Sequence, residues 1–324
     1  MARKLSDLSV AEIRSRYADP ESAVSPQVLA RLRRDPRQGV RQIYQALKGR
    51  YEREREERLR LDGLLNFERV LWKSGVRRIA GVDEAGVGPL AGPVVAAAVV
   101  FAPGCELAGV DDSKRLDAER REELAGRIRS CGAAVAVGVA EVAEIDRINV
   151  YHAALLAMRR AVEALPEPPE HLLVDAREVP GVAVPQNRFD KGDGLNYSIA
   201  AASIIAKTHR DRLMTALDAQ YPEYGFARHK GYGTAEHQEA IRRHGPSDVH
   251  RLSYPFLREL CGEFSAAFYE LRERVWSAAD HRALARAEAE VAGLCASLAE
   301  EEARKLKLTL RRRWDLVAQH EARR

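Results

Sequence analysis

Between about residues 78 and 262, short apolar runs with the composition of β-strands alternate with longer helical stretches. The apolar runs are "RRIAGVD", "PVVAAAVVF", "AAVAVGVA" and "HLLVD", and the helical stretches include "AERREELAGRIRS", "NVYHAALLAMRRAVEAL" and "SIAAASIIAKTHRDRLMTALDAQY". Each strand and helix has an apolar surface that is buried only by packing against another element. The alternation therefore predicts an α/β core, a sheet with helices on its faces.

Polar, helical segments flank this core on both sides. In residues 1–72 apolar side chains recur three and four apart among charges, and Pro20, Pro26 and Pro36 divide the segment into short helices. Residues 263–324 are rich in Ala, Arg and Glu and predict a helical hairpin. We expect a helical N-terminal extension (1–72), a catalytic domain (73–262) and a helical C-terminal extension (263–324). The flanks are interpreted as solvated helices attached to the core, or alternatively as nucleic-acid contacts through "RLRRDPRQ" or "RKLKLTLRRR".

Composition narrows the class of protein. A chain with 46% hydrophobic and 31% charged residues is typical of a soluble globular protein, and the longest apolar run is too short to cross a bilayer. The N-terminus lacks the apolar region of a signal peptide, so a cytoplasmic location is expected. The four cysteines lack the spacing of a zinc site and are expected to be reduced. A net charge of +4 permits an anionic partner without requiring one.

The stretch "GVDEAGVGPLAGP" places two adjacent acids, Asp83 and Glu84, directly before a glycine-rich turn. On a regular strand neighbouring side chains point to opposite faces, so both acids reach one centre only if the strand ends there. Glycines permit such an ending and expose backbone N–H and C=O groups. A dinucleotide-binding turn is excluded because the last glycine gap is one residue too long and prolines occupy the expected helix start.

Two further acids occupy comparable positions. Asp175 ends the apolar run "HLLVD", and Asp193 lies in "DKGDG" before a helix. Taken singly, each acid is interpreted as a cap or turn residue. Together, four carboxylates at strand ends and a helix start form the hard oxygen site that Mg²⁺ or Mn²⁺ prefers. Two such ions, roughly 3.5 to 4 Å apart, catalyse phosphodiester hydrolysis in other proteins.

Five blocks in this order, "AGVDEAGVGPLAGPVVAAAVV", "DDSKRL", "LLVDA", "KGDGLNYSIAAASIIAKTHRDRLM" and "YGFARHKGYGTAEH", resemble the ribonuclease HII family, the bacterial type 2 ribonucleases H. The resemblance covers about residues 75 to 260. It implies a ribonuclease H-like mixed sheet flanked by helices. It also implies an endoribonuclease that cleaves the RNA strand of RNA/DNA hybrids and nicks DNA 5′ to embedded ribonucleotides by two-metal-ion hydrolysis, leaving 5′-phosphate and 3′-hydroxyl ends.

The same resemblance assigns roles to single residues. It implies that Asp83, Glu84, Asp175 and Asp193 are catalytic and bind two divalent ions, Mn²⁺ or Mg²⁺. Lys114 of "DSK" would lie near the scissile phosphate, and Tyr232 of "HKGY" would stack on the nucleotide at the RNA-to-DNA junction. The backbone of Gly86, Val87 and Gly88 would read the 2′-hydroxyl that distinguishes RNA from DNA. The cationic or polar side chains near these blocks either line the phosphate path or are merely solvated: Lys207, Arg210, Arg228, His229 and Lys230.

The implied partners are RNA/DNA hybrids and ribonucleotide-containing duplex DNA, with a role in ribonucleotide excision repair. A monomer is expected. Some members carry a terminal peptide that binds a sliding clamp, and here "LKLTLRRRWDL" is a weak candidate.

Two positions depart from the family pattern. Val87 stands where the turn usually has arginine, and Ala176 follows the strand acid where glycine is common. The main hypothesis is an active enzyme with weaker, less salt-sensitive substrate binding. One alternative is a hybrid-binding protein whose cleavage is impaired, or narrowed to several consecutive ribonucleotides, because of Val87. Another is an unrelated metal-dependent phosphoesterase or structural protein.

Overall fold

The computed structural model describes residues 7–17, 24–262 and 264–321 and divides the chain into two compact units, residues 1–65 and 66–324. In the first unit, α1 (Val10–Arg16) begins with a capping box of Ser9 and Glu12, and α2 (Pro26–Arg33) begins with its cap Ser25. The third helix, α3 (Gln38–Leu64), is long rather than short, because no proline interrupts it after Pro36. These helices enclose an apolar core of Ile13, Val24, Leu29, Leu32, Val40, Ile43 and Leu47.

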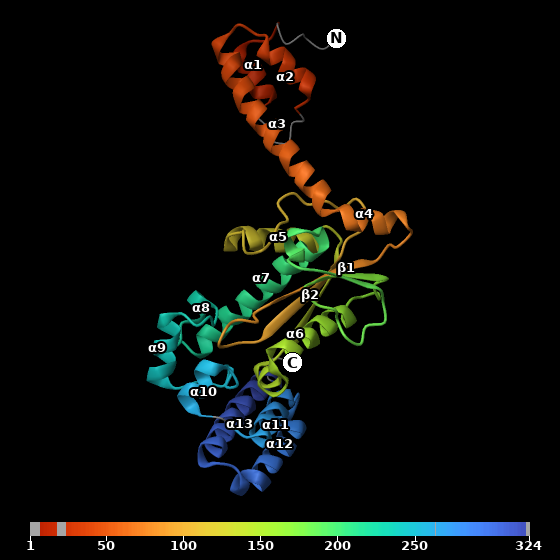
Figure 1. Ribbon diagram of the computed structural model, residues 1–324. Coiled ribbons are helices and arrows are strands. Elements are labelled where there is room, and N and C mark those ends of the chain that lie inside the picture. Colours follow the sequence, from red (N-terminus) through yellow and green to blue (C-terminus); the bar gives the residue numbers. More distant parts are fainter. Residues whose placement is uncertain (1–6, 18–23, 263, 322–324) are drawn as a thin grey trace. The chain divides into compact units, whose positions relative to one another are not determined.

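The second unit contains a five-stranded mixed sheet in the order β3-β2-β1-β4-β5 (Figure 1). Strands β1 (Ile79–Ala85), β2 (Val94–Val100) and β3 (Ala134–Ala140) pair antiparallel. Strands β4 (His171–Asp175) and β5 (Gln186–Phe189) continue the sheet in parallel with β1. The α/β core expected from the sequence is therefore confirmed, and β5, a short and mostly polar strand, is the one that the apolar pattern missed.

Two long helices cover opposite faces of this sheet. Alternate residues of β1 and β4, such as Val82 and Val174, pack against α6 (Val142–Glu163), which kinks at Asn149. The other residues, including Ile79 and Leu173, pack against α7 (Tyr197–Gln220). Helix α7 approaches β1 so closely that a Cβ on Gly81 would lie 2.0 Å from the Ser198 carbonyl carbon, so only glycine fits there.

Helix α4 (Asn66–Lys73) packs with this second unit through a buried acid. Glu68 is fully buried, and its Oε1 accepts a hydrogen bond of 2.9 Å from the Ser198 N–H at the start of α7. The first N–H groups of a helix have no partner within the helix. Glu68 therefore caps α7 from a distant part of the sequence.

Of the remaining helices, the first lies between β2 and β3 in the sequence, and the others follow α7. They are α5 (Ala118–Ser130), α8 (Phe226–His229), α9 (Ala235–His244), α10 (Pro255–Cys261), α11 (Ala266–Ser277), α12 (His281–Leu294) and α13 (Glu300–Glu321). Residues 266–321 thus form three helices rather than the expected hairpin, because Asp280 caps a separate helix α12. Helix α11 is joined to α6 by a fully buried ion pair between Arg272 and Asp146. Within the described residues no helix is both long and apolar enough to cross a bilayer.

Two buried histidines support the segment after α8. His237 Nδ1 donates to the Tyr232 carbonyl at 2.9 Å, so its Nε2 accepts the N–H of His250 Nε2 at 3.0 Å. His250 Nδ1 in turn accepts from the N–H and hydroxyl of Ser247. Each ring is therefore neutral. Burial lowers the pKa of His237 to about 4 and holds that of His250 well below 6.5.

The residue after β4 has a strained backbone. Ala176 has φ +53°, and the Arg177 N–H donates to the Asp175 carbonyl across it at 2.6 Å. Left-handed backbone costs an L-residue about 1–2 kcal/mol, whereas glycine adopts it without a Cβ clash. This conformation explains physically why glycine suits the position.

The histidine pair predicts a stability loss in mild acid. A histidine in the unfolded chain takes up a proton near pH 6.5, whereas the pKa of the folded His237 is about 4. The contribution of neutral His237 to the free energy of unfolding is therefore fully present above pH 6.5 and decreases as the pH falls below it. Between pH 7 and 4.5 the loss from His237 is about 2–3 kcal/mol. Melting temperatures by circular dichroism should fall more steeply in the wild type than in His237→Gln. The exposed control His152→Gln should follow the wild type, and equal slopes in all three would contradict the assignment.

The strained turn gives a second prediction. Ala176→Gly should stabilise the protein by about 1 kcal/mol or less, since relief of strain is partly offset by unfolded-state entropy. The matched control, Ala216→Gly on the exposed face of α7, should destabilise it by about 1 kcal/mol. Urea unfolding measures both. A loss of stability at Ala176 equal to that of the control would show that the turn is unstrained.

Candidate active site

The four acids singled out by the sequence lie at one end of the sheet. Asp83 and Glu84 are near the end of β1, Asp175 ends the parallel neighbour β4, and Asp193 lies in the short η2 helix (Gly192–Gly194) before α7. As expected, β1 ends directly after the acid pair: its last residue is Ala85, and it pairs with β2 up to that residue. Its pairing with β4, however, stops at Val82, which opens the β4 side of β1 at Asp83.

Each carboxylate has a hydrogen-bond or ionic partner from the chain. Asp83 Oδ1 accepts from the Glu84 N–H at 2.8 Å, and Asp175 Oδ1 accepts from the Gly192 N–H at 2.6 Å. Asp193 Oδ2 accepts from Lys114 Nζ at 2.9 Å, so the lysine of the "DSK" block reaches the acids. Both Asp83 and Asp193 are buried.

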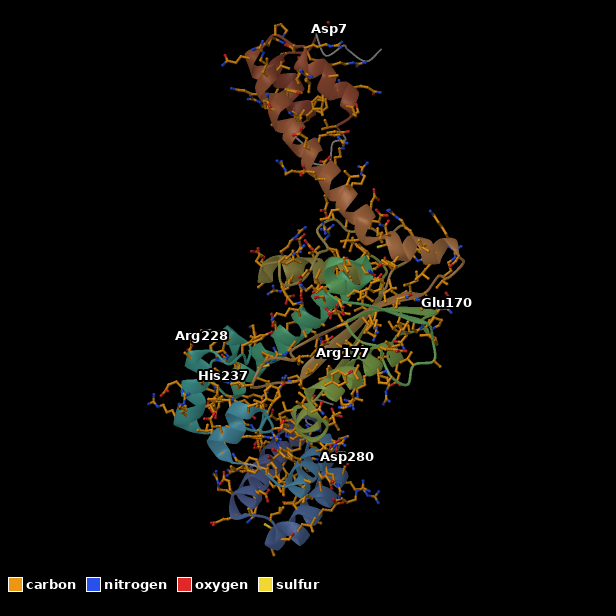
Figure 2. All side chains as sticks on the ribbon, viewed as in Figure 1. Asp7, Glu170, Arg177, Arg228, His237 and Asp280 are labelled. Atoms are coloured by element: carbon orange, nitrogen blue, oxygen red, sulfur yellow. The ribbon has the colours of Figure 1, made fainter. Side chains whose placement is uncertain are left out.

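The pKa shifts show that these acids share one electrostatic environment. Burial raises the pKa of Asp83 well above its usual value, and the charges of Glu84, Asp175 and Asp193 raise it further. Burial also raises the pKa of Glu84, while Arg177 Nη1, 3.6 Å from Glu84 Oε1, opposes that rise. Arg177 lies beside the sheet in the middle of the catalytic part (Figure 2). Crowded carboxylates that destabilise one another's charge form a site that favours a cation.

The donor set fits hard divalent ions. The carboxylate oxygens are the ligand type that Mg²⁺ and Mn²⁺ prefer, and the buried Glu84 Oε2 has no hydrogen-bond partner among the described residues. In the same described part of the chain, no three acidic, histidine or cysteine side chains converge closely enough to hold an ion as they stand. Lys114, Arg177 and the Gly192 N–H each contact one of the acids: Asp193, Glu84 and Asp175 respectively.

The glycine-rich turn lies directly beyond the acids. Gly86 has φ +96°, a left-handed conformation, and Gly88 is exposed. The Val87 side chain packs against the apolar core and lines a hollow of about 530 Å³ with Tyr254 and Pro255. The turn therefore exposes its backbone to solvent at Gly88, and the Val87 side chain is directed toward the protein interior.

Tyr232 is close to this turn. Its ring is 43% exposed, and its Cε1 lies 3.9 Å from the position that a Cβ on Gly88 would occupy. Lys207 Nζ lies 5.7 Å from the ring centroid, within cation–π range. Exposed aromatic rings beside polar backbone are the surfaces on which nucleotides stack.

The residues suggested for the phosphate path differ in accessibility. Arg210 is fully buried and donates to the carbonyls of Ala91, Pro93 and Lys230, so that suggestion is wrong for Arg210. Lys207 pairs with Asp211, and Arg228 on α8 pairs with Glu236 (Figure 2). His229 bonds to the Tyr224 carbonyl and the Gly231 N–H, and Lys230 Nζ bonds to Thr215 and the Ala227 carbonyl.

Sequence reasoning missed two arginines of this region. Arg177 contacts Glu84, and its position two residues after Asp175 was the available signal. Arg251 lies beneath the glycine-rich turn, and nothing in its sequence surroundings indicated that contact.

Comparison with known proteins adds independent findings. A model of ribonuclease HII matches residues 80–256, and a model of the ribonuclease HII N-terminal domain matches residues 9–72. Ribonuclease HII of Myxococcus xanthus is 52% identical over 260 residues, which cover 80% of this chain and 89% of that protein. Ribonuclease HII of Geobacillus kaustophilus is 54% identical over 228 residues, 69% of this chain and 87% of its own length.

Among solved structures, the crystal structure of ribonuclease H2 from Pyrococcus horikoshii OT3 is 25% identical, with a TM-score of 0.47. The match covers 56% of this chain and 96% of that one. The family match spans more than half of the chain and includes all four acids, the glycine-rich turn and Tyr232. This chain belongs to the ribonuclease HII family and is a ribonuclease H enzyme.

Proposed function

We propose that this enzyme cleaves the RNA strand of RNA/DNA hybrids and nicks duplex DNA on the 5′ side of a single embedded ribonucleotide, leaving 5′-phosphate and 3′-hydroxyl ends. The observation that carries the proposal is the grouping of four mutually repelling acids beside a turn whose backbone is exposed at Gly88 and beside the exposed Tyr232. The acids supply a site for phosphate hydrolysis, and the turn and ring supply a site that distinguishes ribose from deoxyribose.

The acids would hold two divalent ions, Mn²⁺ or Mg²⁺, through Asp83, Glu84, Asp175 and Asp193. Bound ions of this kind activate water and stabilise the charge that develops on the leaving oxygen. Lys114 would contact the scissile phosphate; its ammonium group at Asp193 and its mostly exposed side chain support this role. Its positive charge would orient the anionic backbone toward the acids.

Recognition of the ribonucleotide is assigned to the turn and to Tyr232. The 2′-hydroxyl is both a donor and an acceptor, and bare backbone at Gly86–Gly88 can approach it without side-chain bulk. The exposed ring of Tyr232 beside Gly88 offers a flat surface for the neighbouring nucleotide. Because Val87 packs toward the core, its replacement of arginine leaves this backbone surface intact, which supports retained cleavage.

A nicking assay tests the proposal. A labelled DNA duplex with one internal ribonucleotide and an RNA/DNA hybrid of the same sequence are incubated with enzyme and either Mg²⁺ or Mn²⁺. We expect cleavage of both, with the duplex cut once, 5′ to the ribonucleotide. Cleavage of the hybrid alone would mean that the substrate range is narrowed, and cleavage of neither would exclude the proposed activity.

Asp83→Asn should abolish cleavage of both substrates without loss of the fold. The substitution removes a buried charge that three other acids repel, so the melting temperature should stay equal or rise. The control Asp117→Asn changes an exposed acid that caps α5, a role that Asn also performs, and should remain active. Near-normal turnover in Asp83→Asn would remove Asp83 from the site.

Val87→Arg should tighten substrate binding and steepen its salt dependence by about one released counterion. Binding constants between 50 and 200 mM salt provide the slope, with cleavage of both substrates measured alongside. The control Val70→Arg adds the same charge at an exposed position on α4 and should leave the slope unchanged. A Val87→Arg slope identical to the wild type would show that position 87 does not reach substrate phosphate.

A further inference from the structure

Beneath the glycine-rich turn lies an arginine whose donors go entirely to uncharged groups. Arg251 is fully buried, and within the described residues its guanidinium contacts no carboxylate. Its Nε donates to the Gly92 carbonyl at 2.9 Å, and its Nη2 donates to the carbonyls of Gly86 and Gly92 at 2.6 and 2.8 Å. A cation is costly to bury unless every donor is satisfied, so a strict geometry is required of the surrounding backbone.

The remaining guanidinium nitrogen of Arg251, Nη1, and the Tyr254 hydroxyl both donate to the carbonyl at the centre of the turn, that of Val87. Arg251 Nη1 donates to the Val87 carbonyl at 3.0 Å and to the Tyr254 hydroxyl oxygen at 2.6 Å. The Tyr254 hydroxyl then donates to the same Val87 carbonyl at 2.6 Å. Two donors therefore fix the Val87 carbonyl, and a third fixes that of Gly86.

Peptide planarity converts these contacts into a direction for the N–H groups. In a trans peptide the C=O of one residue and the N–H of the next point in opposite directions. With the Gly86 and Val87 carbonyls directed inward at Arg251, the N–H groups of Val87 and Gly88 are directed away from it. No residue in the described part of the chain accepts a hydrogen bond from either N–H. Gly88 is exposed, so its donor faces the surface beside Tyr232.

We infer that Arg251 and Tyr254 are positioning residues for ribose recognition: they orient the Val87 and Gly88 N–H groups to donate to the 2′-hydroxyl of the substrate. The inference rests on the proposed function. It also explains why the side chain at position 87 can change, since the donors are set by Arg251 and Tyr254 and not by Val87. The pair would act on discrimination between ribose and deoxyribose and not on the affinity for duplex in general.

The test measures two affinities for each variant. In an Asp83→Asn background, which prevents cleavage, fluorescence anisotropy gives Kd for a DNA duplex with one ribonucleotide and for the same duplex without it. The ratio of Kd for the all-DNA duplex to Kd for the duplex with one ribonucleotide isolates the contribution of the 2′-hydroxyl to binding. Adding Tyr254→Phe removes one hydrogen bond to the Val87 carbonyl and should reduce the ratio about 3- to 10-fold, while Kd for the all-DNA duplex stays within about 2-fold.

The matched control is Tyr224→Phe. Tyr224 is buried, whereas Tyr254 is half-buried, and the Tyr224 hydroxyl likewise donates to a backbone carbonyl, that of Gly245, at 2.6 Å. The same atom is removed from the same kind of bond at another place, so this variant should keep the parent ratio. Arg251→Lys should reduce the ratio further, because one ammonium group cannot reach the carbonyls of Gly86, Val87 and Gly92 together.

The outcomes separate the inference from the function on which it rests. A Tyr254→Phe ratio equal to that of the parent would overturn the inference and leave the proposed function standing. A parent protein that binds both duplexes equally would overturn both. If Arg251→Lys does not fold, the comparison of Tyr254→Phe with Tyr224→Phe still decides the question.

Discussion

The close approach of α7 to β1 at Gly81 is the contact on which the site depends. Backbone meets backbone there, since even one methyl group on Gly81 would overlap the Ser198 carbonyl. This approach brings η2 and its Asp193 against the end of the sheet, where Asp83 and Asp175 already lie side by side. Helix α7 also carries Arg210, which donates to the carbonyls of Ala91 and Pro93 after the glycine-rich turn and to that of Lys230, two residues before Tyr232. The acids and the glycine-rich turn thus share one helix as their support.

The site combines two opposite electrostatic arrangements within a few residues. Four acids are placed where each raises the free energy of its neighbours' charge, which leaves the group ready for cations. Just beyond them, Arg251 and Arg210 are buried against backbone carbonyls, and the carbonyl dipoles stabilise their positive charge. The acids can therefore attract external cations while the buried arginines remain committed to the protein.

Much of this architecture followed from the sequence. The apolar runs located β1 to β4, and the stretch "SIAAASIIAKTHRDRLMTALDAQY" correctly predicted helix α7. Strand β5 was not predicted from the apolar pattern, because an edge strand needs little apolar surface. The role of Arg210 was misjudged, since charge in the sequence suggests solvent or phosphate, and only tertiary packing reveals a guanidinium surrounded by carbonyls. Arg251 was missed for the same reason, because the carbonyls that its guanidinium contacts are 158 to 165 residues away.

Glu68 determines how far the N-terminal part can be removed without loss of the α7 cap. Although the N-terminal family match extends to residue 72, Glu68 belongs to the second compact unit and supplies the carboxylate that caps α7. A chain that starts at residue 73 would leave the Ser198 N–H without this partner, two residues after the α7 cap Asn196 and five after Asp193. A chain that starts at Asn66 would keep it. The boundary between the two compact units therefore lies before α4, and this helix packs with the unit that contains the four acids.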